Sequence, residues 1–521
     1  MNLTGYSFIG NSRATDSSDY FTPSNAATGE QLEPTFYSAT TADLQKAVTL
    51  ATEAFQAYSK VDPKTRAKFL RTIGEKINAA GPDITPRMMA EAGLPEPRCE
   101  GERGRTIGQL NMFADLIEEG SWVDARIETA DPDRAPIPKP DLRSMRRPLG
   151  PVAVFCASNF PLAFSVAGGD TASALATGCP VIVRAHSAHA GVAEIVASAV
   201  QAAVIECEMP EGTFSMIFDS GIELGTALVT NPGVKAVGFT GSRAGGRALM
   251  DAAAARPEPI PVFAEMSSVN PIFILPGAMA ERGEQIAQDL IGSVTLGAGQ
   301  FCTCPGLVFG HTSEAFESTL QGGFNDAAPA TMLHGGILNN FANSLKKLRG
   351  QSGVDTIGEV TSDEANKACP AILKASASDF TSNPELSAEI FGPSSLIIEC
   401  GSKDDMMNAA HSLEGQLTAT VHGTDEELAH AGELLQILEQ KAGRVIINGF
   451  PTGVEVNSAM VHGGPYPATS DGASTSVGTG AILRYTRPVS FQSFPDSALP
   501  VELQDANPAG IARLVNGTLE K

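Results

Sequence analysis

The chain has 521 residues and a mass of 54.2 kDa. A single hydrophobic core stops growing at about 250–300 residues, so this length predicts two or three sub-domains. Hydrophobic residues make up 42% and charged residues 18%, which excludes an intrinsically disordered chain. The 36 basic and 59 acidic residues give a formal net charge of −23, which argues against nucleic acid or an anionic membrane as a partner.

The N-terminal segment and the cysteine content both predict a cytoplasmic protein. Residues 1–20 lack the basic start and the apolar stretch of a signal peptide, and no run of consecutive apolar residues is long enough to predict a membrane-spanning helix. Eight cysteines are too few for a disulfide framework in a chain of this length, so most of them are expected to be buried thiols.

The first 150 residues predict helices followed by an extended segment. Two helices are expected, and the second of them runs through Phe69, Ile73 and Ile77. Residues 120–150 contain five prolines, which favour an extended linker or hairpin between domains. The first helix, capped by Thr41, is expected from apolar residues at spacings of three and four, namely Leu44, Ala47, Val48, Ala51 and Phe55.

From Pro151 to Ala264, short β-branched runs alternate with alanine-rich helical runs. This alternation is typical of successive βα units, and it predicts a mostly parallel sheet covered by helices on both faces. Such a sheet binds ligands at the C-terminal ends of its strands. A second α/β region is expected from about Asn270 to Ala468, and the tail after Val477 is expected to be extended again.

The segment Gly299-Gln300-Phe301-Cys302 is the first candidate site. Its small residues could leave the thiol exposed at a turn, where it would be a nucleophile, although a lone cysteine is more often a buried structural thiol. Cys304, two residues later, could form half of a metal site together with Cys302. No CxxC or HExxH pattern accompanies it, so no metal is expected. The pair His186 and His189 is expected to consist of surface imidazoles.

Two further polar residues follow apolar strands. Glu265 ends the strand PIPVFAE, so it either faces solvent or has a raised pKa as a general base. Asn159 follows the first strand of the predicted parallel sheet, where its amide could donate to a developing oxyanion. The alternative for Asn159 is an ordinary turn residue before Phe160 and Pro161.

Residues 239–246, with the sequence FTGSRAGG, run from a strand into a glycine-rich helix start. Backbone N–H groups and the helix dipole at such a start favour a bound phosphate. The spacing is not GxGxxG, so a packing turn remains the alternative.

Together, a thiol nucleophile, an amide donor, a carboxylate base and a dinucleotide-type sheet describe oxidation of an aldehyde through a covalent thioester. The chain resembles the aldehyde dehydrogenase superfamily, which has Asn-Phe-Pro, Phe-Thr-Gly-Ser, a glutamate-containing segment, Gly-Gln-x-Cys and Glu-x-Phe-Gly-Pro in this order. All five segments are present, the last at residues 389–393. The resemblance covers the chain from about residue 30 to about residue 500.

The resemblance implies an α/β fold with a Rossmann-type cofactor domain, an α/β catalytic domain and an extended oligomerisation arm. It assigns residues 1–127 and 150–264 to the dinucleotide-binding domain and residues 265–476 to the catalytic domain. Residues 128–149 and 477–521 would form the oligomerisation arm and the C-terminal tail. The expected assembly is a homodimer or homotetramer.

The resemblance also implies the roles of the site residues. Cys302 would attack the aldehyde, the Asn159 amide and the Cys302 N–H would hold the oxyanion, and Glu265 would activate the water that releases a free acid. A further set would contact the cofactor, namely Thr240, Gly241, Ser242, Glu389 and Phe391.

The adenine ribose site departs from the family pattern. Arg184 stands where the family has a lysine, and Ser187 stands where NAD-selective members often have a glutamate. A guanidinium can bind a 2′-phosphate bidentately, so NADP is the expected cofactor, with NAD possible because the following loop contains Asp219 and Glu223. Residues 462–465 read His-Gly-Gly-Pro, where the family has Pro-Phe-Gly-Gly.

Within the superfamily, long segments are similar to those of enzymes that oxidise α-ketoglutaric semialdehyde to 2-oxoglutarate, and this is the expected reaction. Arg103 or Arg105 would bind the distant carboxylate, with a solvated cation at a helix start as the alternative, and Phe164 would contact the substrate. The competing interpretations are a medium- or long-chain fatty aldehyde dehydrogenase, thioester hydrolysis without redox chemistry, and a catalytically silent structural or binding paralogue.

Overall fold

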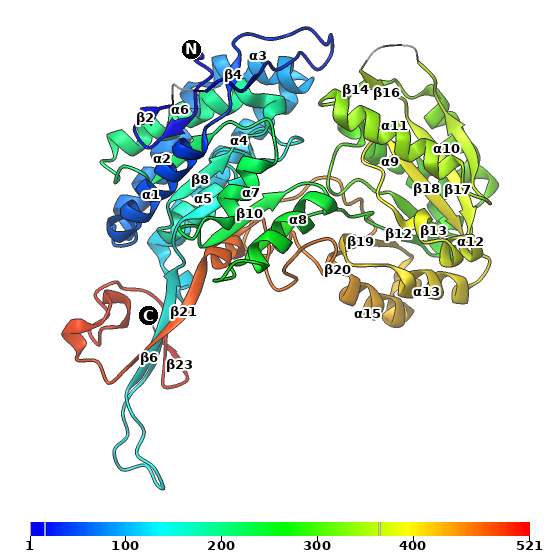
Figure 1. Cartoon of the computed structure of the whole chain (residues 1–521). Helices are drawn as coiled ribbons and strands as arrows, with labels where there is room; N and C mark the ends of the chain where they lie inside the picture. The colour runs from blue at the N-terminus through cyan, green and yellow to red at the C-terminus, as the bar shows by residue number, and fades with distance from the viewer. Residues whose placement is uncertain (1, 15–16, 363, 365, 521) are drawn as a thin grey trace.

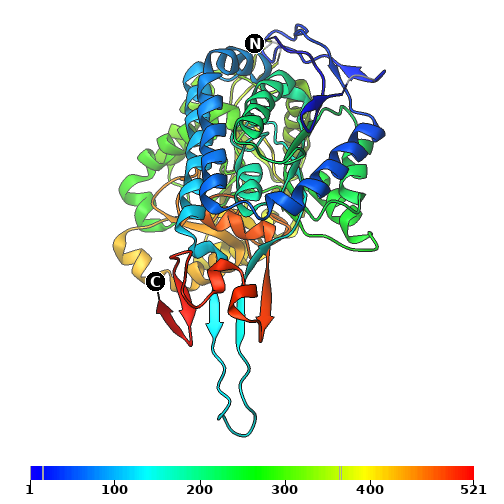
Figure 2. The ribbon, with the colours of Figure 1, turned by 90° about the vertical axis from the view of Figure 1, so that its left-hand side faces the viewer.

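The structure is a computed structural model that describes residues 2–14, 17–362, 364 and 366–520. Two seven-stranded sheets form two bodies, and a five-stranded sheet extends away from the first of them (Figure 1). Seen from the side, the N-terminal helices lie along the outside of the first body, and a hairpin projects below it (Figure 2).

The first sheet has the strand order β11-β10-β7-β8-β9-β1-β2. Its first five strands run parallel, and the short strands β1 and β2 add to one edge in antiparallel orientation. The chain order reverses between β7 and β10, and such a reversal opens a ligand crevice at the C-terminal strand ends. The strands are β1 (Phe8–Ile9), β2 (Ser12–Arg13), β7 (Val152–Phe155), β8 (Val181–Arg184), β9 (Phe214–Ile217), β10 (Ala236–Thr240) and β11 (Val262–Glu265).

Helices cover both faces of this sheet because successive strand residues point to opposite sides. Val152 and Val154 of β7 pack into the core formed with α2 to α6, whereas Ala153 and Phe155 pack into the core formed with α1, α7 and α8. The helices are α1 (Thr41–Tyr58), α2 (Pro63–Ala79), α3 (Gly81–Ala92), α4 (Glu96–Glu119), α5 (Gly169–Thr177), α6 (Ala190–Glu206), α7 (Glu223–Thr230) and α8 (Arg243–Ala254).

Helix α1 is capped by Thr40, so the prediction that Thr41 is the cap is wrong by one residue. The Thr40 hydroxyl accepts the N–H of Asp43 at 3.1 Å, and the Asp43 carboxylate accepts the N–H of Thr40 at 2.9 Å. This reciprocal pair requires an acid three residues after the cap, a position that Asp43 occupies relative to Thr40 and not to Thr41.

Helix α6 lies within a long apolar span. The span Ser187–Glu206 is long and apolar enough to cross a membrane by length and composition, although polar residues interrupt it. In the fold, 72% of its apolar 18-residue window is buried inside the protein, and α6 packs against α2, α3 and β9. A helix that is apolar on all sides fits a position in the core as well as it fits a bilayer.

The second sheet has the order β15-β17-β18-β13-β12-β19-β20, with β15 antiparallel to the rest. Its strands are β12 (Ile272–Ile274), β13 (Leu307–Gly310), β15 (Asp355–Glu359), β17 (Ala371–Ser376), β18 (Ser394–Glu399), β19 (Gln416–His422) and β20 (Ala442–Ile447). The helices of this body are α9 (Pro276–Thr295), α10 (Glu314–Asp326), α11 (Gly335–Arg349), α12 (Ala377–Ser382), α13 (Lys403–Ser412), α14 (Asp425–His430) and α15 (Gly432–Lys441). Two further sheets have only two strands each. One pairs β3 (Tyr20–Phe21) with β4 (Phe36–Tyr37), and the other pairs β14 (Ala330–Thr331) with β16 (Lys367–Ala368).

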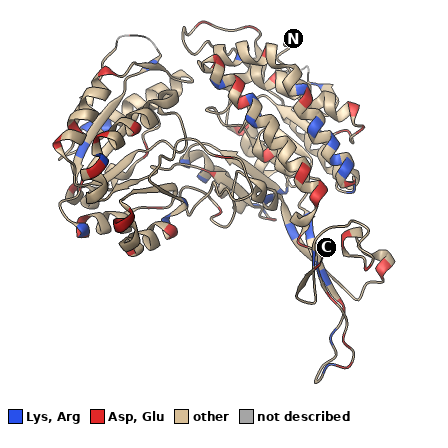
Figure 3. Ribbon diagram, turned by 180° about the vertical axis from the view of Figure 1, so that it is seen from behind, with Lys and Arg blue, Asp and Glu red and all other residues tan. Residues whose placement is uncertain are grey.

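The five-stranded sheet, which we call the arm, contains the extended hairpin expected at residues 120–150. Along its strands, Lys and Arg positions stand out among the charged residues (Figure 3). The tail is not extended throughout, because residues 479–485 form a 3₁₀ helix that buries Ile482 and Tyr485 before the chain enters the arm. The arm has the order β21 (Thr486–Gln492), β6 (Leu142–Pro148), β5 (Arg126–Glu128), β22 (Arg513–Val515) and β23 (Thr518–Glu520).

The sheets group the chain in the same sequence order as the expected domains, but the domain boundaries themselves stay a prediction. Strand β11 of the first sheet ends at Glu265, one residue past the expected limit of the dinucleotide-binding domain. Glu265 therefore belongs to the first sheet by hydrogen bonding, since Thr240 of β10 is its neighbour in the parallel ladder.

Candidate active site

A tight turn presents Cys302. The residues before it, Gly297, Ala298 and Gly299, all have left-handed backbone conformations, with φ angles of 55°, 57° and 65°. A Cβ atom at Gly299 would lie 2.3 Å from the backbone of Gly392, so glycine is required at this position. The turn therefore packs directly on the segment that contains Phe391.

Side-chain amides hold the backbone around the thiol. The Asn270 amide donates to the carbonyl oxygens of Cys302 at 2.8 Å and Cys304 at 3.0 Å. The Asn159 amide donates to the carbonyl oxygen of Gln300 at 3.1 Å. The predicted oxyanion donor, Asn159, thus contacts the cysteine turn at Gln300, which is two residues before Cys302.

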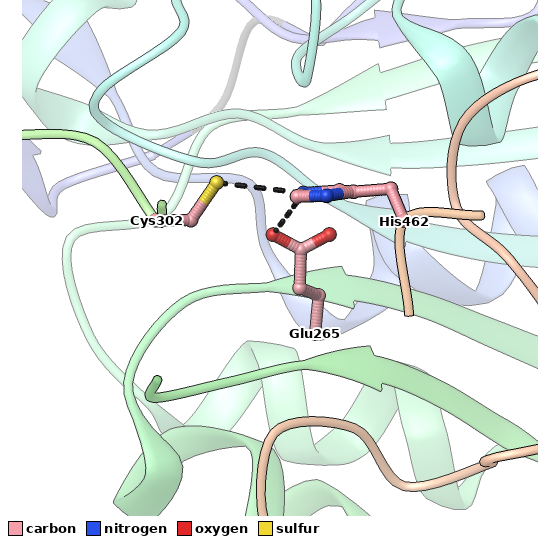
Figure 4. Close-up of side chains that lie close together, drawn as sticks. All are labelled: Glu265, Cys302 and His462. Carbon is pink, nitrogen blue, oxygen red and sulfur yellow. Dashed lines mark hydrogen bonds and ion pairs between the residues drawn. The ribbon is translucent and has the colours of Figure 1, made fainter. Parts of the chain in front are cut away.

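Cys302, His462 and Glu265 form a continuous chain of contacts (Figure 4). The Cys302 Sγ lies 3.4 Å from the Nε2 of His462, and the same nitrogen lies 3.0 Å from the Oε1 of Glu265. The Ser476 hydroxyl donates to the other carboxylate oxygen of Glu265 at 2.8 Å. The imidazole is 1% exposed and the carboxylate 2%, so both groups interact away from bulk water.

The environment shifts the pKa values of the two outer members in opposite directions. Burial, followed by the charge of Glu265, raises the pKa of Cys302 well above its ordinary value. Burial also acts to raise the pKa of Glu265, but His462 and the hydroxyl of Ser476 outweigh it, so the pKa of this carboxyl is lowered. Glu265 is therefore buried and ionised, which differs from the raised pKa expected from the sequence, because that expectation included no histidine partner.

A cavity of about 220 Å³ opens onto the thiol. Three phenylalanines form much of its wall, and Arg98, Glu102 and Arg105 come from helix α4. The Nε and Nη2 atoms of Arg105 are buried without a hydrogen-bond partner among the described residues. The residues that line the cavity include Arg98, Glu102, Arg105, Phe160, Phe164, Phe301, Cys302 and His462.

The two predicted substrate arginines have different surroundings. The Arg105 guanidinium carbon lies 5.6 Å from the ring centre of Phe164 and 5.8 Å from that of Phe160. Arg103 is not among the residues that line the cavity; its guanidinium pairs with Glu100. The geometry thus favours Arg105, and not Arg103, as a group that a ligand beside Cys302 could reach.

Glu102 ties helix α4 to the loop after β7. Its Oε1 accepts the N–H groups of Leu162 at 2.8 Å and Ala163 at 3.0 Å, and its Oε2 pairs with Arg98 at 2.9 Å. This loop contains Asn159, so a residue of α4 holds the backbone close to the predicted oxyanion donor.

The predicted cofactor residues lie around a second cavity and along the strand ends of the first sheet. Glu389 lines a cavity of about 490 Å³ together with Ser267 and Ser268. Burial raises the pKa of Glu389 to about 7, opposed by hydrogen bonds from Ser267 and Ser268. Glu389 and Phe391 both line a smaller pocket with Gly299 and Cys304, on the other side of the cysteine turn.

The remaining cofactor residues follow strands β8 and β10. Thr240 ends β10, and Ser242 caps helix α8, its hydroxyl accepting the N–H of Gly245 at 3.2 Å. Arg184 ends β8, where its Nη2 donates to the carbonyl oxygens of Gly221 at 2.7 Å and Asp219 at 3.3 Å, and Ser187 lies in the loop that follows. Strands β8 and β10 flank β7, so these four residues follow strand ends on either side of the first strand of the parallel sheet.

The expectation of two surface imidazoles at residues 186 and 189 is wrong for His189. His189 is 1% exposed, and its Nε2 lies 2.8 Å from the carbonyl oxygen of Ala157, so it braces the loop that leads to Asn159. His186 is half-buried and stacks on His189.

The sequence-based prediction missed His462 and Ser476. The sequence shows His462 only as a departure from the family pattern, because its contacts are with Cys302 and Glu265, which lie more than a hundred positions away in the chain. The departure itself was the available signal, because a titratable side chain in place of an apolar one next to two glycines changes the chemistry of the site.

Comparison with known proteins gives consistent matches. The sequence profile described as "Aldehyde dehydrogenase family" matches residues 13–332. The chain is 48% identical to α-ketoglutaric semialdehyde dehydrogenase 2 of Azospirillum brasilense, with 100% of both chains covered. It is 45% identical to the α-ketoglutaric semialdehyde dehydrogenase of Acinetobacter baylyi, with 99% of this chain and 98% of that one covered.

Solved structures agree on the fold. Betaine aldehyde dehydrogenase of Staphylococcus aureus superposes with a TM-score of 0.80 at 20% identity, covering 95% of this chain and 96% of the other. This likeness confirms the α/β fold that the sequence predicted.

Proposed function

The chain belongs to the aldehyde dehydrogenase family, and we propose that it oxidises α-ketoglutaric semialdehyde to 2-oxoglutarate, with release of the free acid. Members of this family use NAD or NADP. The observation that supports the choice of substrate is Arg105, a buried cation without a hydrogen-bond partner in a small cavity next to the thiol. Steady-state kinetics with a panel of semialdehydes and simple aldehydes, each with NAD and NADP, tests the proposal.

The mechanism begins with the thiolate of Cys302. Its sulfur attacks the aldehyde carbon, and the Asn159 amide and the Cys302 N–H hold the oxygen that becomes negative. The nicotinamide cofactor, when bound, supplies the hydride acceptor for the next step. Glu265, ionised and buried at 2% exposure, then takes a proton from the water that attacks the thioester. Because Glu265 provides this base, the acyl group leaves as a carboxylic acid.

The chain's residues fit a dinucleotide at the strand ends of the first sheet. A Cβ atom at Gly241 would lie 2.7 Å from the ring of Phe239, so a larger residue before helix α8 would have to displace that ring. The N-terminus of α8 provides N–H groups and a positive dipole for a pyrophosphate. Thr240, Gly241 and Ser242 would hold the pyrophosphate of the dinucleotide. Glu389 and Phe391 would contact its nicotinamide half.

Arg105 is proposed to bind the carboxylate of the substrate. Burial lowers the pKa of Arg105, and its two unpaired nitrogens lack the hydrogen bonds that buried polar atoms normally make. A carboxylate in the cavity would supply both the opposite charge and the acceptors. Phe160 and Phe164 would pack on the carbon chain between the two ends of the substrate.

Replacing Arg105 with alanine is expected to lower kcat/KM for α-ketoglutaric semialdehyde about thirtyfold, corresponding to about 2 kcal/mol for a lost buried charge pair. The value for pentanal, which has the same length and no carboxylate, should change little. The matched control is Arg103→Ala, which removes an arginine of the same helix that pairs with Glu100 outside the cavity. An equal loss for both aldehydes in Arg105→Ala would contradict the assignment.

A fatty aldehyde is the second candidate substrate, favoured by the aromatic wall of Phe160, Phe164 and Phe301. A long alkyl chain would gain from this surface but would bury Arg105 without a partner. Comparing kcat/KM for α-ketoglutaric semialdehyde with that for decanal separates the two, and a higher value for decanal would favour the fatty aldehyde.

For the cofactor, we propose a preference for NADP with NAD also accepted. The Nη2 of Arg184 is held by backbone carbonyls and its Nε lies 3.4 Å from Asp219, whereas its Nη1 makes no hydrogen bond to a described residue. That nitrogen is available to a 2′-phosphate, and Ser187 adds no opposing charge. The Asp219 carboxylate limits the preference, which is why NAD stays acceptable.

Replacing Arg184 with alanine is expected to lower kcat/KM for NADP about tenfold, since a hydrogen bond to a charged group contributes about 1.5–3 kcal/mol. The value for NAD should change by less than about twofold, because NAD has no 2′-phosphate. Titrating both cofactors at a fixed aldehyde concentration measures the ratio. A parallel loss for both would mean that Arg184 only stabilises the loop of Gly221.

The arm is proposed to join subunits into a homodimer or homotetramer in the cytoplasm. Strands β21 and β23 form its two edges, and unpaired edges promote aggregation unless another chain covers them. Leu519 is 74% exposed and Ile137 is 68% exposed, so the arm also has apolar surface to bury. The first sheet with its helices would serve as the dinucleotide-binding domain and the second as the catalytic domain.

A further inference from the structure

Cys302, His462 and Glu265 direct one sulfur, one nitrogen and one oxygen atom into the same small volume. We propose that these three side chains form a binding site for a thiophilic divalent cation such as Zn²⁺, and that the bound ion inhibits the enzyme reversibly. This inhibition goes beyond the proposed function, which needs no metal. The sequence predicts no metal here, because the three ligands come from separate segments of the chain.

The spacing of the three ligand atoms fits zinc. Nε2 of His462 lies 3.4 Å from Sγ of Cys302 and 3.0 Å from Oε1 of Glu265, and ligand atoms of all three side chains lie within 4.8 Å of one another. A tetrahedral zinc ion with its usual bond lengths separates such atoms by about 3.4–3.6 Å. The two distances from the nitrogen therefore need to change by less than about 0.5 Å when the ion binds.

A single ring nitrogen faces both of its neighbours (Figure 4). An imidazole nitrogen carries either one proton or one lone pair in the plane of the ring. Nε2 of His462 can therefore make a full hydrogen bond to the sulfur or to the carboxylate, but not to both at once. A cation bound at the lone pair would lie within reach of all three ligands, so this arrangement suits a shared ion better than it suits two hydrogen bonds.

The chemistry and the charge of the ligands select the kind of ion. Thiolate, imidazole and carboxylate all bind zinc in proteins, whereas Mg²⁺ and Ca²⁺ prefer oxygen ligands alone. The thiol of Cys302 would release its proton to solvent as the sulfur binds the ion. The resulting thiolate and the Glu265 carboxylate would then balance both positive charges. This balance is needed because Arg105 and Arg444 also act on the thiol, with only Glu389 to offset them.

Neighbouring groups hold the ligands in place and leave a path for the ion. The Ser476 hydroxyl donates to Oε2 of Glu265 at 2.8 Å, which leaves Oε1 for the ion, and the backbone N–H of His462 donates to the hydroxyl of Thr475 at 2.8 Å. Such outer contacts orient the ligands of a metal site. Cys302 and His462 both line the cavity of about 220 Å³, which offers an entry path and room for the water that completes a three-ligand zinc site.

A bound ion would stop the proposed reaction at its first step. The sulfur lone pair that attacks the aldehyde would be bound to the metal, and the carboxylate that activates water would be a ligand as well. A chelator would restore activity, because it removes the ion without breaking a covalent bond. Until then the ion would protect the thiol from alkylation and oxidation, which both require a free thiolate.

The site is tested by binding of Co²⁺ as a spectroscopic substitute for Zn²⁺, without aldehyde or cofactor. Cobalt bound to a thiolate absorbs in the near ultraviolet by charge transfer from sulfur, and displacement of Co²⁺ by Zn²⁺ gives the zinc affinity. His462→Gln and Cys302→Ala each remove one ligand. The matched controls are Cys304→Ala, which removes the thiol two residues away, and His311→Gln, which changes a histidine with a 74% exposed side chain beside Glu399. Thermal melting checks that each variant is folded.

We expect the wild type and both controls to show the sulfur band, and the wild type to lose half its activity below about 10 µM free Zn²⁺ and to regain it with EDTA. Mg²⁺ at about 1 mM should not inhibit. His462→Gln should bind Zn²⁺ at least about 100-fold more weakly, and Cys302→Ala should lose the band.

Three outcomes would overturn the proposal. They are a folded wild type that binds neither ion, a band that survives in Cys302→Ala, and a zinc affinity in His462→Gln equal to that in His311→Gln. The last two would place the ion at other side chains. Because the band needs no aldehyde, a wrong assignment of the substrate would leave it unchanged, so this test is separate from a failure of the proposed function.

Discussion

Replacing Cys302 with alanine is expected to abolish aldehyde oxidation, with a fall in kcat of at least about 10⁴-fold, because no covalent intermediate can then form. Cys304, two residues away, cannot take over. Its sulfur lies 3.9 Å from the carbonyl oxygen of Val294, and burial, followed by the charge of Glu389, raises its pKa to about 12. The measurement is nicotinamide absorbance with α-ketoglutaric semialdehyde at saturating cofactor.

The control for this variant is Cys207→Ala, a partly buried thiol whose sulfur contacts the hydroxyl of Thr72, far from the cavity. It should keep the activity of the wild type. Thermal melting and cofactor binding by Cys302→Ala should also stay close to wild-type values. Residual oxidation within tenfold of the wild type would mean that another group forms the intermediate, and the proposed mechanism would fail.

Glutamine in place of Glu265 is expected to separate the two halves of the reaction. The first turnover should still occur as a burst equal to the amount of enzyme, because Cys302 and Asn159, which act before the thioester forms, are unchanged. Steady-state turnover should then fall about 10³-fold, since water must attack the thioester without a base. Rapid mixing with absorbance detection resolves the burst from the slow phase.

Glu258→Gln provides the matched control, because its carboxylate is 72% exposed and pairs with Lys235 at the surface. It should leave both phases unchanged. If Glu265→Gln loses the burst along with turnover, the carboxylate also acts before hydride transfer. If steady-state turnover is unaffected, another group activates the water.

Much of the fold and part of the site followed from the sequence, because their signals are local. The alternation of strands and helices between residues 151 and 264 predicted the parallel sheet, and the polar residues at its strand ends predicted Asn159 and Glu265 as neighbours of one crevice. The family was predicted from five segments that each lie within a few residues. Their roles in catalysis stay predictions until the variants are measured.

The unpredicted features depend on distant contacts. No local pattern brings His462 to Glu265, so the direction of the carboxyl pKa shift could not be derived from the strand PIPVFAE alone. The choice between Arg103 and Arg105 was accessible in principle. Residues 98, 102 and 105 of helix α4 are spaced by four and three, which puts them on one face, whereas residue 103 falls on another.

Helix α4 also limits how this enzyme can change. The same turn of the helix provides Arg105 toward the cavity and Glu102 toward the N–H groups of Leu162 and Ala163. Substitutions in this helix that reshape the pocket for a new aldehyde are therefore expected also to shift the loop that carries Asn159, the proposed oxyanion donor. Val454 lines the same cavity from outside helix α4, so we expect substitutions there to change specificity with a smaller effect on turnover.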